Sequence, residues 1–396
     1  MTGTIAARRR FPLVPLLFLS GLLYLNFTSR VILAPLLPLL ETELGLGHGA
    51  VGSLFFFQAA GYALGLLAAG WTAWYLAHHG TIVLSALALG ISLLALSRVP
   101  SLGTMQACLV LLGIGAGLYL PSGIATIADI TAERQWGRAT AIHELAPAVG
   151  FVTAPLVAEA LLRWLSWRAI LGVLGVVLLI GGVLYARWGQ GGRQRAEPPS
   201  LRTMVALATD GALVRISALF VLAVAAGYGL YAMFPLFLIA ERGMNRASAN
   251  TLVGLSRLLT LPMIFIAGWL ADRLSHRRAL AAFQAATGGL TVLLALAPGP
   301  WMTGLAVVLQ AGASVCFFPA YYPLVSQLVP SAKRHLAISV VSLAGMLLGG
   351  GLTPPMIGYL AESWSFAAGI LVVGVLTFVS PALLLSARTP SRSVSC

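Results

Sequence analysis

The chain has 396 residues, of which 59% are hydrophobic and 9% are charged, and its formal net charge at pH 7 is +13. A typical soluble domain is about 25% charged, so this chain has too few polar groups to cover a globular surface and is predicted to lie in a lipid bilayer. The positive charge does not indicate nucleic-acid binding, because the basic residues cluster at the ends of apolar segments and form no stripe interleaved with exposed aromatic side chains.

Apolar segments long enough to cross a bilayer follow one another along the chain. A spanning helix needs about 20 apolar residues, because only internal backbone hydrogen bonds are available in lipid. The first segment follows a cluster of arginines but continues past Arg30 without a cleavage site of small residues, so it is predicted to be a retained span and not a signal peptide. The sequence therefore predicts an all-α membrane protein with twelve transmembrane helices, at about residues 12–41, 49–77, 80–98, 102–129, 136–163, 166–187, 212–240, 247–272, 278–297, 301–328, 334–361 and 365–387.

One polar connector divides the twelve spans into six and six. Gln190–Arg202 is the only sizeable polar stretch of sequence between two spans. We therefore expect an N-terminal six-helix half at residues 1–189, a cytoplasmic linker at 190–211 and a C-terminal six-helix half at 212–396. The simplest interpretation of the connector is a flexible linker with no further role.

Lysine and arginine are distributed unevenly between the predicted loops. Sixteen of them fall on the side that holds both termini, and five fall on the other side. Basic residues are enriched in the cytoplasmic loops of membrane proteins. This distribution predicts a multi-pass protein of the inner (plasma) membrane with both termini in the cytoplasm.

The two halves of the sequence contain matching residues at a constant offset. The offset is 198 residues (268 minus 70), which is half of the 396-residue chain. Three pairs of positions share it, namely Gly70 and Gly268, Pro121 and Pro319, and Gly45 and Gly243. A long apolar chain built from two copies of one unit is typical of membrane transporters.

A loop motif after the eighth span resembles that of the major facilitator superfamily. The pattern Gly-x-x-x-Asp-Arg-x-x-x-Arg-Arg is met by Gly268, Asp272, Arg273, Arg277 and Arg278. The resemblance covers about residues 12–387 and implies two six-helix halves that rock about a central site. It also implies a gating role for these five residues, in which Asp272 and nearby cations hold helices together in one state and release them in another. The alternative is an ordinary positive loop with a solvated aspartate.

The sequence departs from the superfamily pattern in the first half. The loop after the second span has Trp74 in place of the aspartate and His78 and His79 in place of the basic pair. The first half is therefore expected to lack the usual charged latch. The fourth span also lacks the arginine common in proton-coupled drug exporters, and the antiporter-type pattern from Gly150 to Ala158 has alanine for two glycines.

Two arginines are predicted to lie inside the membrane at similar depth. Arg30 in the first span and Arg257 in the eighth are each about eleven residues from the outer end, or about 16 Å at 1.5 Å per residue. A charged residue at this depth is costly and usually faces a cavity, and the guanidinium fork suits a carboxylate or phosphate. Arg257 resembles the substrate-binding arginine of monocarboxylate and oxalate transporters. Arg30 resembles that of organic-anion symporters, although Ser29 replaces their preceding acidic residue. The alternative is that each arginine braces neighbouring helices.

Glu144 and His143 in the fifth span are candidates for proton coupling. Burial in a low-dielectric medium favours the protonated form of a carboxyl group, and an imidazole titrates near neutral pH. Adjacent residues on a helix point about 100° apart, so at most one of the two is expected to face a cavity. The alternative is that Glu144 binds Arg138 or a loop backbone.

Uncharged polar residues of the inner spans are candidates to complete an anion-binding pocket. Helix packing is the alternative explanation for each of them. They are Asn26, Gln58, Tyr62, Tyr119, Tyr228, Tyr231, Tyr321 and Tyr322. The glycines of the eleventh span, Gly345 and Gly349–Gly351, favour close helix contacts over a phosphate-binding loop, because no strand precedes them. The sequence contains no nucleotide-binding, zinc or nucleophile-triad motif, so we expect neither a cofactor nor a metal.

The sequence favours a monomeric secondary transporter over an enzyme. The leading prediction is transport of a small organic anion, with a carboxylate as the favoured class, coupled to protons or in exchange for another anion. An efflux pump for amphipathic compounds is the first alternative, favoured by the aromatic-rich interior. A membrane sensor or enzyme with a transporter-like body is the second, and it is disfavoured because the spans leave no catalytic constellation and no soluble domain.

Overall fold

Every regular element that the structure describes is helical. The computed structural model describes residues 11–197, 201–330 and 334–385, and within these ranges it contains no strand. A helix satisfies all backbone hydrogen bonds within one segment, which lipid requires. Six of the basic residues used to predict the orientation lie outside the described ranges, namely Arg8, Arg9, Arg10, Lys333, Arg388 and Arg392.

The predicted spans are confirmed. Eleven helical runs are long and apolar enough to cross a membrane. The longest, α3 (His48–Leu96), has 49 residues but departs from helical geometry at Ala77, where φ is 59° and ψ is 171°. This break divides α3 into two lengths that match the predicted second and third spans, so the eleven runs account for twelve spans.

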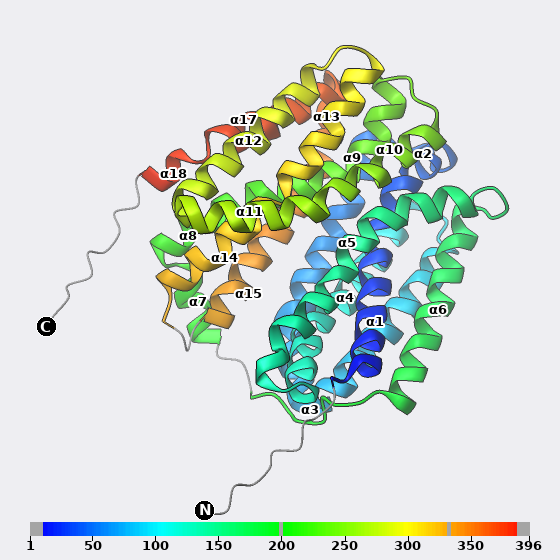
Figure 1. Ribbon diagram of the computed structural model, residues 1–396. Helices are drawn as coiled ribbons and strands as arrows, with labels where there is room; N and C mark the ends of the chain where they lie inside the picture. The colour runs from blue at the N-terminus through cyan, green and yellow to red at the C-terminus, as the bar shows by residue number, and fades with distance from the viewer. Residues whose placement is uncertain (1–10, 198–200, 331–333, 386–396) are drawn as a thin grey trace, which may run out of the picture.

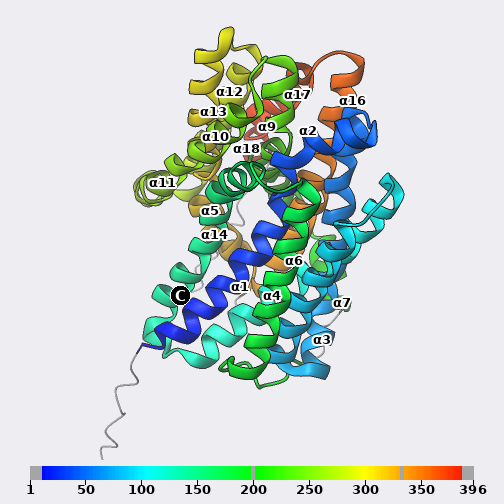
Figure 2. The same cartoon turned by 90° about the vertical axis from the view of Figure 1, so that its right-hand side faces the viewer.

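The first half of the molecule, α1 to α6, begins with a bent helical rod. Figure 2 shows α1 and α2 crossing this half as one rod with a bend between them. The bend follows from Pro35, which has no N–H to donate to the carbonyl of Val31, the last residue of α1. The helices are α1 (Leu13–Val31), α2 (Leu33–Leu44), α3, α4 (Leu102–Ile130), α5 (Trp136–Leu161) and α6 (Trp167–Trp188).

The second half, α8 to α17, contains more irregular turns than the first. Three π-helical turns and one 3-10 turn interrupt its spans, and such turns often mark functional positions. The turns are η2 (Ala225–Gly229), η3 (Phe237–Glu241), η4 (Arg257–Leu259) and η6 (Gly345–Gly351). The helices are α8 (Gly211–Val224), α9 (Leu230–Leu236), α10 (Arg246–Ser256), α11 (Thr260–Leu274), α12 (His276–Leu296), α13 (Gly299–Ser314), α14 (Phe317–Leu328), α15 (Arg334–Ala344), α16 (Leu352–Ser363) and α17 (Phe366–Val379), with the short α18 (Ala382–Leu385) after them.

The 198-residue repeat is also present in the backbone. Gly45 and Gly243 both end a helical run in the left-handed region, with φ of 62° and 66°. Ala77 and Ser275, which share the same offset, are the only two non-glycine residues with positive φ among the described residues, at 59° and 85°. The two copies therefore share their turns as well as parts of their sequence.

Glycines bring the helices that carry the central residues into close contact. A Cβ atom at Gly61 or Gly65 of α3 would lie 2.1 Å from a backbone carbonyl oxygen of α4. A Cβ atom at Gly113 or Gly117 of α4 would meet the backbone of α3 in the same way. Such i, i+4 pairs of small residues are typical of membrane helix interfaces. The close contacts predicted for the glycines of the eleventh span are likewise confirmed, since a Cβ at Gly349 would lie 2.3 Å from the carbonyl oxygen of Val221.

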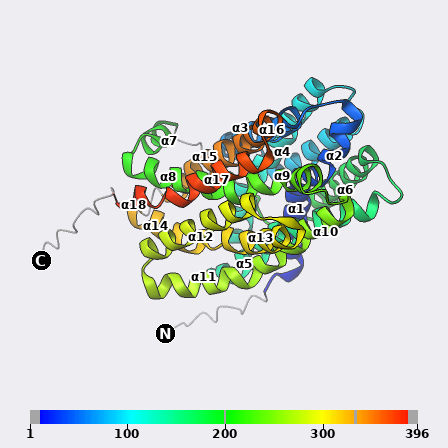
Figure 3. The ribbon, with the colours of Figure 1, turned by 90° about the horizontal axis from the view of Figure 1, so that it is seen from above.

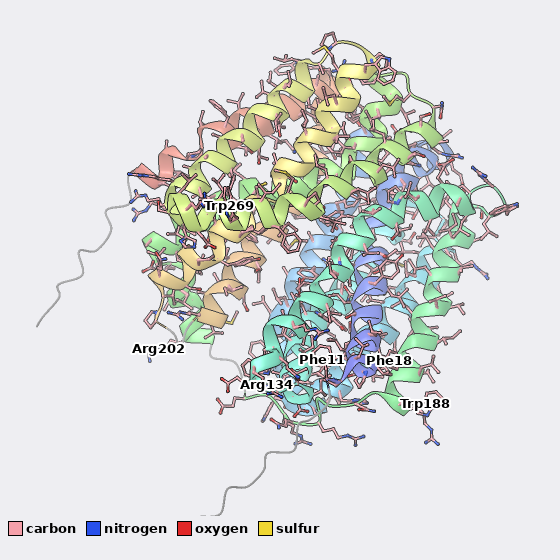
Figure 4. The ribbon with its side chains drawn as sticks, in the orientation of Figure 1. Phe11, Phe18, Arg134, Trp188, Arg202 and Trp269 are labelled. Carbon is pink, nitrogen blue, oxygen red and sulfur yellow. The ribbon has the colours of Figure 1, made fainter. Side chains whose placement is uncertain are left out.

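The two halves lie side by side and are in closest contact at one end. Seen from above, α1 to α6 lie mainly on one side of the molecule and α11 to α15 on the other (Figure 3). The halves meet at the end that carries the turns at Gly45 and Gly243, which we term the closed end (Figure 1). They diverge toward the end that carries the breaks at Ala77 and Ser275, which we term the open end. Figure 4 places Phe11, Arg134 and Trp188 of the first half at the open end.

Glycines also permit the contact between the halves at the closed end. A Cβ atom at Gly52 of α3 would lie 2.7 Å from the carbonyl oxygen of Pro354 in α16. A Cβ atom at Gly358 of α16 would lie 2.2 Å from the carbonyl oxygen of His48. Helices of opposite halves therefore touch backbone to backbone, which leaves no room for larger side chains at these positions.

The connector between the halves is bound to the first half, contrary to the flexible linker that the sequence favoured. The Asp129 carboxylate at the end of α4 accepts a hydrogen bond from the backbone N–H of Gly192, at 2.9 Å. The backbone N–H of His79 donates to the Gly192 carbonyl at 2.8 Å, and the N–H of His78 donates to the Gln194 carbonyl at 3.3 Å. The connector is therefore an ordered segment, although its composition is rich in polar residues and glycine. Farther along, α7 (Leu201–Ala208) bounds a cavity of about 410 Å³ with residues of α8 and α14.

Gly192→Ala is expected to release the connector from the first half. Gly192 has a φ of 67°, and a Cβ atom there would lie 2.5 Å from the Thr126 hydroxyl oxygen. Left-handed backbone costs a residue with a side chain about 1–2 kcal/mol, which corresponds to a factor of about 5–30 in a local equilibrium. Trypsin should cut after Arg193 several-fold faster in the variant. Gly211→Ala, at a position with open space around it, is the control, and equal cleavage of both variants would contradict the bound state.

Candidate functional site

A cavity of about 290 Å³ lies between the two halves. Its wall combines aromatic rings with two arginines and one carboxylate, Arg30, Arg257 and Glu144. The rings are those of Phe27, Tyr62, Tyr119, Phe151, Phe220, Tyr228, Phe318 and Tyr322. A mostly apolar wall with a few ionisable groups is typical of a site for a small molecule. The two arginines predicted from opposite halves of the sequence are therefore brought to one cavity.

Arg30 is buried between aromatic rings of the first half. Its guanidinium carbon lies 5.0 Å from the ring centroid of Phe27 and 4.7 Å from that of Tyr62. No acceptor is bonded to its Nε within the described part of the chain. The backbone carbonyl of Arg30 accepts a hydrogen bond from the Gln58 side chain at 3.2 Å, and the Gln58 carbonyl oxygen accepts one from the Tyr228 hydroxyl. Gln58 therefore links this part of α1 to the second half.

Arg257 lies in the 3-10 turn η4, where α10 passes into α11. Its guanidinium carbon is 5.0 Å from the ring centroid of Phe151 and 4.9 Å from that of Tyr231. Its Nη2 donates to the carbonyl of Gly227 in η2 at 3.2 Å. Each guanidinium carries five N–H donors. Among the described residues, the bond from Arg257 to Gly227 is the only hydrogen bond that either guanidinium donates to a protein acceptor. Neither arginine is paired with a carboxylate there.

An aromatic pair connects the two arginines across the boundary between the halves. The rings of Phe27 and Phe151 are 4.7 Å apart in an edge-to-face arrangement, with an interplanar angle of 71°. Arg30 lies over the first ring and Arg257 lies over the second. Phe151 comes from α5 of the first half, whereas Arg257 belongs to the second. Rocking of the halves must therefore change the contact between this ring and its arginine.

The predicted polar residues divide into those that line the cavity and those that lie behind its wall. Asn26, Tyr62, Tyr119, Tyr228 and Tyr322 line it. Gln58, Tyr231 and Tyr321 are outside its lining. Gln58 lies behind Arg30, and Tyr231 lies against Arg257 with its hydroxyl donating to the Phe151 carbonyl at 3.4 Å. Tyr321 is fully buried and donates to the Ile216 carbonyl.

Glu144 is not buried in the way the sequence predicted. Half of its side-chain surface (50%) is exposed and it lines the cavity, whereas the adjacent His143 side chain is completely buried. The two side chains approach each other, with His143 Nδ1 at 3.6 Å from Glu144 Oε1. Arg138, the alternative partner, instead lies over the ring of Phe11 at 4.8 Å. Arg138 and Glu144 are six residues apart on α5, so their side chains point in different directions and into different surroundings.

A charged network fastens the halves together at the closed end. Arg246 of α10 donates two hydrogen bonds to the Glu159 carboxylate of α5, at 3.1 and 3.2 Å. The Asn250 amide adds a third donor to the same carboxylate at 3.0 Å. On the other side of the molecule, the Glu362 carboxylate of α16 accepts from the backbone N–H of Gly49 in α3 at 2.9 Å. These bonds join the two halves and must break if the closed end is to open.

Comparison with known proteins identifies the family of this chain. The family model described as the Major Facilitator Superfamily matches residues 17–244 and again 216–395, which together span nearly the whole sequence. The chain belongs to the major facilitator superfamily. It is therefore a membrane transporter for small molecules and not an enzyme, as the loop motif and the repeat predicted.

Individual relatives and solved structures are similar over most of the chain. The cis,cis-muconate transport protein of Acinetobacter baylyi is 23% identical over 407 residues, covering 95% of this chain and 94% of the relative. The 3-(3-hydroxy-phenyl)propionate transporter of Escherichia coli is 28% identical over 300 residues, covering 67% and 68%. A bacterial homologue of the human lysosomal transporter Spinster, solved inward-facing and unoccupied, superposes with a TM-score of 0.77 at 16% identity, covering 96% of this chain and 98% of that one. The solved structure shows that this chain shares its fold.

The superfamily loop motif lies at the open end, away from the cavity. Gly268 and Asp272 belong to the last turns of α11, and Arg277 and Arg278 to the first turn of α12. The Arg273 guanidinium lies over the ring of Trp269 at 4.1 Å (Figure 4). Asp272 is exposed and forms no ion pair with any residue of the described ranges. In this conformation the motif holds no helices of opposite halves together, so its gating role stays a prediction for the state with this end closed.

Four phenylalanines that line the cavity were not predicted from the sequence. Phe27, Phe151, Phe220 and Phe318 line the wall, yet none was a candidate. The chain has 16 phenylalanines, and a phenylalanine within an apolar span gives no signal of whether it faces lipid, another helix or a cavity. The one available signal was proximity, because Phe27 precedes Arg30 by almost one helical turn.

Proposed function

We propose that the protein transports a small organic carboxylate by alternating access. The observation that carries this proposal is the pair of buried arginines in one cavity, neither of which has a carboxylate partner in the described part of the chain. Burying a cation without a counter-charge is costly. An anionic substrate would supply that counter-charge and the acceptors for the remaining N–H groups.

The aromatic wall favours a carboxylate with a planar, unsaturated body. Eight rings surround a space of about 290 Å³, which is the size of a small organic acid and too small for a lipid or a long peptide. The Acinetobacter and Escherichia relatives are named as transporters of muconate and of a phenylpropionate. Both compounds are carboxylates with conjugated or aromatic carbon frames, which supports the same class of substrate here.

The proposed orientation places the open end in the cytoplasm. Both termini are predicted to be cytoplasmic from the distribution of basic residues, and Phe11, near the N-terminus, lies at the open end (Figure 4). The structure then corresponds to an inward-open state of a monomer in the inner membrane. Transport would proceed by proton coupling or by exchange. The closed end would open while the loop motif of α11 and α12 closes the open end.

Efflux of amphipathic compounds is the second candidate function, favoured by the same eight rings. Aromatic walls accept many lipophilic molecules, and cations stack on aromatic faces. The arginines oppose this candidate, because Arg30 and Arg257 already occupy the faces of four of the nearby rings and would repel a cationic compound.

Binding to a matched pair of ligands tests the proposed function. We expect benzoate to raise the unfolding temperature of the purified protein and benzamide, of equal shape but without charge, to have at least about tenfold weaker affinity, since a charged hydrogen-bond partner contributes about 1.5–3 kcal/mol. Larger unsaturated dicarboxylates extend the series. Stabilisation by lipophilic cations and by no carboxylate of the series would reject the carboxylate proposal in favour of efflux.

A further inference from the structure

We propose that His143 and Glu144 together form one proton-binding site, in which Tyr119 fixes the orientation and tautomer of the imidazole ring. The proposal rests on the proposed anion transport and specifies its proton coupling. Both residues contribute to the site, because Glu144 lines the cavity and the His143 ring is buried directly behind it.

The tautomer of His143 follows from counting hydrogens on Tyr119. The Tyr119 hydroxyl donates its single proton to the backbone carbonyl of Leu19 at 2.6 Å. The same oxygen lies 3.1 Å from His143 Nε2, so in that contact it can act only as the acceptor. Nε2 must therefore carry the proton of the neutral ring. His143 Nδ1 is then an unprotonated acceptor.

That unprotonated nitrogen faces Glu144 without any donor between them. Nδ1 is buried and has no hydrogen-bond partner among the described residues, and it lies 3.6 Å from Glu144 Oε1. Two acceptors at this distance repel each other when the carboxylate is ionised. One proton placed between them converts the repulsion into a charge-assisted hydrogen bond, which is about 2.7–2.9 Å long. The pair therefore binds one proton and contracts when it does so.

Other charged and titratable groups lie near His143 and Glu144, and they do not prevent this pair from binding a proton. Tyr119 of α4 and Tyr322 of α14 are close enough to the Glu144 carboxylate to interact with its charge. Phenols are neutral near pH 7. The remaining ionisable groups of the cavity are Arg30 and Arg257, and no other carboxylate lines it.

The position of the pair couples proton binding to anion binding with a definite sign. Two arginines and an ionised Glu144 give the cavity a net charge of +1, and a proton on the pair raises it to +2. An anion binds more tightly to the higher charge. Because this coupling is reciprocal, a bound anion also increases the affinity of the pair for a proton. The structure thus favours co-transport of a proton with the anion over exchange of one for the other.

Closure of the open end would enclose both ligands in one space. Tyr322 of α14 and Ser342 of α15, both from the second half, line the same cavity as Glu144. When these helices move toward α5, Glu144 loses its contact with the solution at that end. Proton and anion would then be released together at the opposite side.

Nitrogen NMR of the protein with labelled histidines tests the site without any anion. The signal of His143, identified among the six histidines by its loss in His143→Gln, should show the Nε2–H tautomer at high pH. Tyr119→Phe should release the tautomer preference. Tyr24→Phe, which removes a hydroxyl bonded to Thr153 of α5, the helix that carries His143, should leave the tautomer unchanged.

Proton uptake on anion binding, measured with an indicator dye in weakly buffered solution, is the second readout. The parent should take up protons when the carboxylate binds, and Glu144→Gln should take up fewer, with an anion affinity that depends less on pH, because the imidazole of His143 remains. An Nδ1–H tautomer, or proton uptake by Glu144→Gln equal to that of the parent, would overturn the proton site. Anion binding that persists in that case would leave the proposed transport function standing, whereas a failure of all carboxylates to bind would reject that function separately.

Discussion

Replacing Arg257 by lysine is expected to reduce uptake of the carboxylate at least about tenfold while the protein still folds. The guanidinium lies close to the rings of Phe151 and Tyr231 and donates to the Gly227 carbonyl. Lysine keeps the charge but cannot present two parallel donors or stack as a plane. Loss of one charge-assisted hydrogen bond costs about 1.5–3 kcal/mol, and 1.4 kcal/mol corresponds to a factor of about ten. Arg257→Ala, which also removes the charge, should be more severe.

The matched control for this variant is Arg242→Lys. Arg242 also donates to a backbone carbonyl, that of Ala295 at 3.0 Å, and lies over the ring of Phe237 at 5.0 Å. It is outside the cavity, so its replacement should leave uptake within about twofold of the parent, as is usual for changes away from a site. Uptake into vesicles is the measurement. Equal losses in both variants would show that Arg257 has only a structural role.

Replacing Glu159 by glutamine is expected to populate states in which the closed end is open. Its carboxylate accepts two bonds from Arg246 and one from Asn250 across the boundary between the halves. These bonds exist only when that end is closed, so their loss favours the other state by about 1 kcal/mol or more, a shift of about fivefold or more in population. The distance between spin labels at Trp164 and Ala247, exposed positions at this end, should become longer and more widely distributed.

Glu43→Gln is the control for the closed-end network. Glu43 lies at the same end and pairs with Arg168 at 2.9 Å, but both residues belong to the first half. Its loss should leave the label distance unchanged, because an ion pair within one half is present in both states. A longer label distance in Glu43→Gln, or an unchanged label distance in Glu159→Gln, would mean that the bonds between the halves do not set the equilibrium between the open and closed states of this end.

The fold could be predicted from the sequence because lipid leaves few solutions. Only helices satisfy their backbone in the bilayer, and the 198-residue offset, visible at Gly45 and Gly243, reappears in the backbone as a shared left-handed turn. The arginines of the cavity could be predicted for a related reason. A charge within an apolar span is rare and costly, so Arg30 and Arg257 could be recognised as candidates from the sequence alone.

Features that depend on the direction of a side chain, or on backbone bonds, could not be predicted in the same way. Tyr321 and Tyr322 are adjacent, and only the second lines the cavity, because neighbours on a helix point about 100° apart. Phe151 looks in the sequence like any other apolar residue of its span. The connector binds largely through backbone groups, at Gly192 and His79 among others, and backbone bonds leave no mark in the sequence.

The bound connector also sets a length limit on the transport cycle. Hydrogen bonds hold it to the first half as far as Ala196, whose backbone N–H donates to the Ala73 carbonyl, and α7 begins at Leu201 against the second half. Only five Cα steps join Ala196 to Leu201, and an extended chain covers at most about 18 Å in that number of steps. As long as both attachments hold, the two halves stay tethered at this point of the open end, and elsewhere they can move apart only by rotating about it.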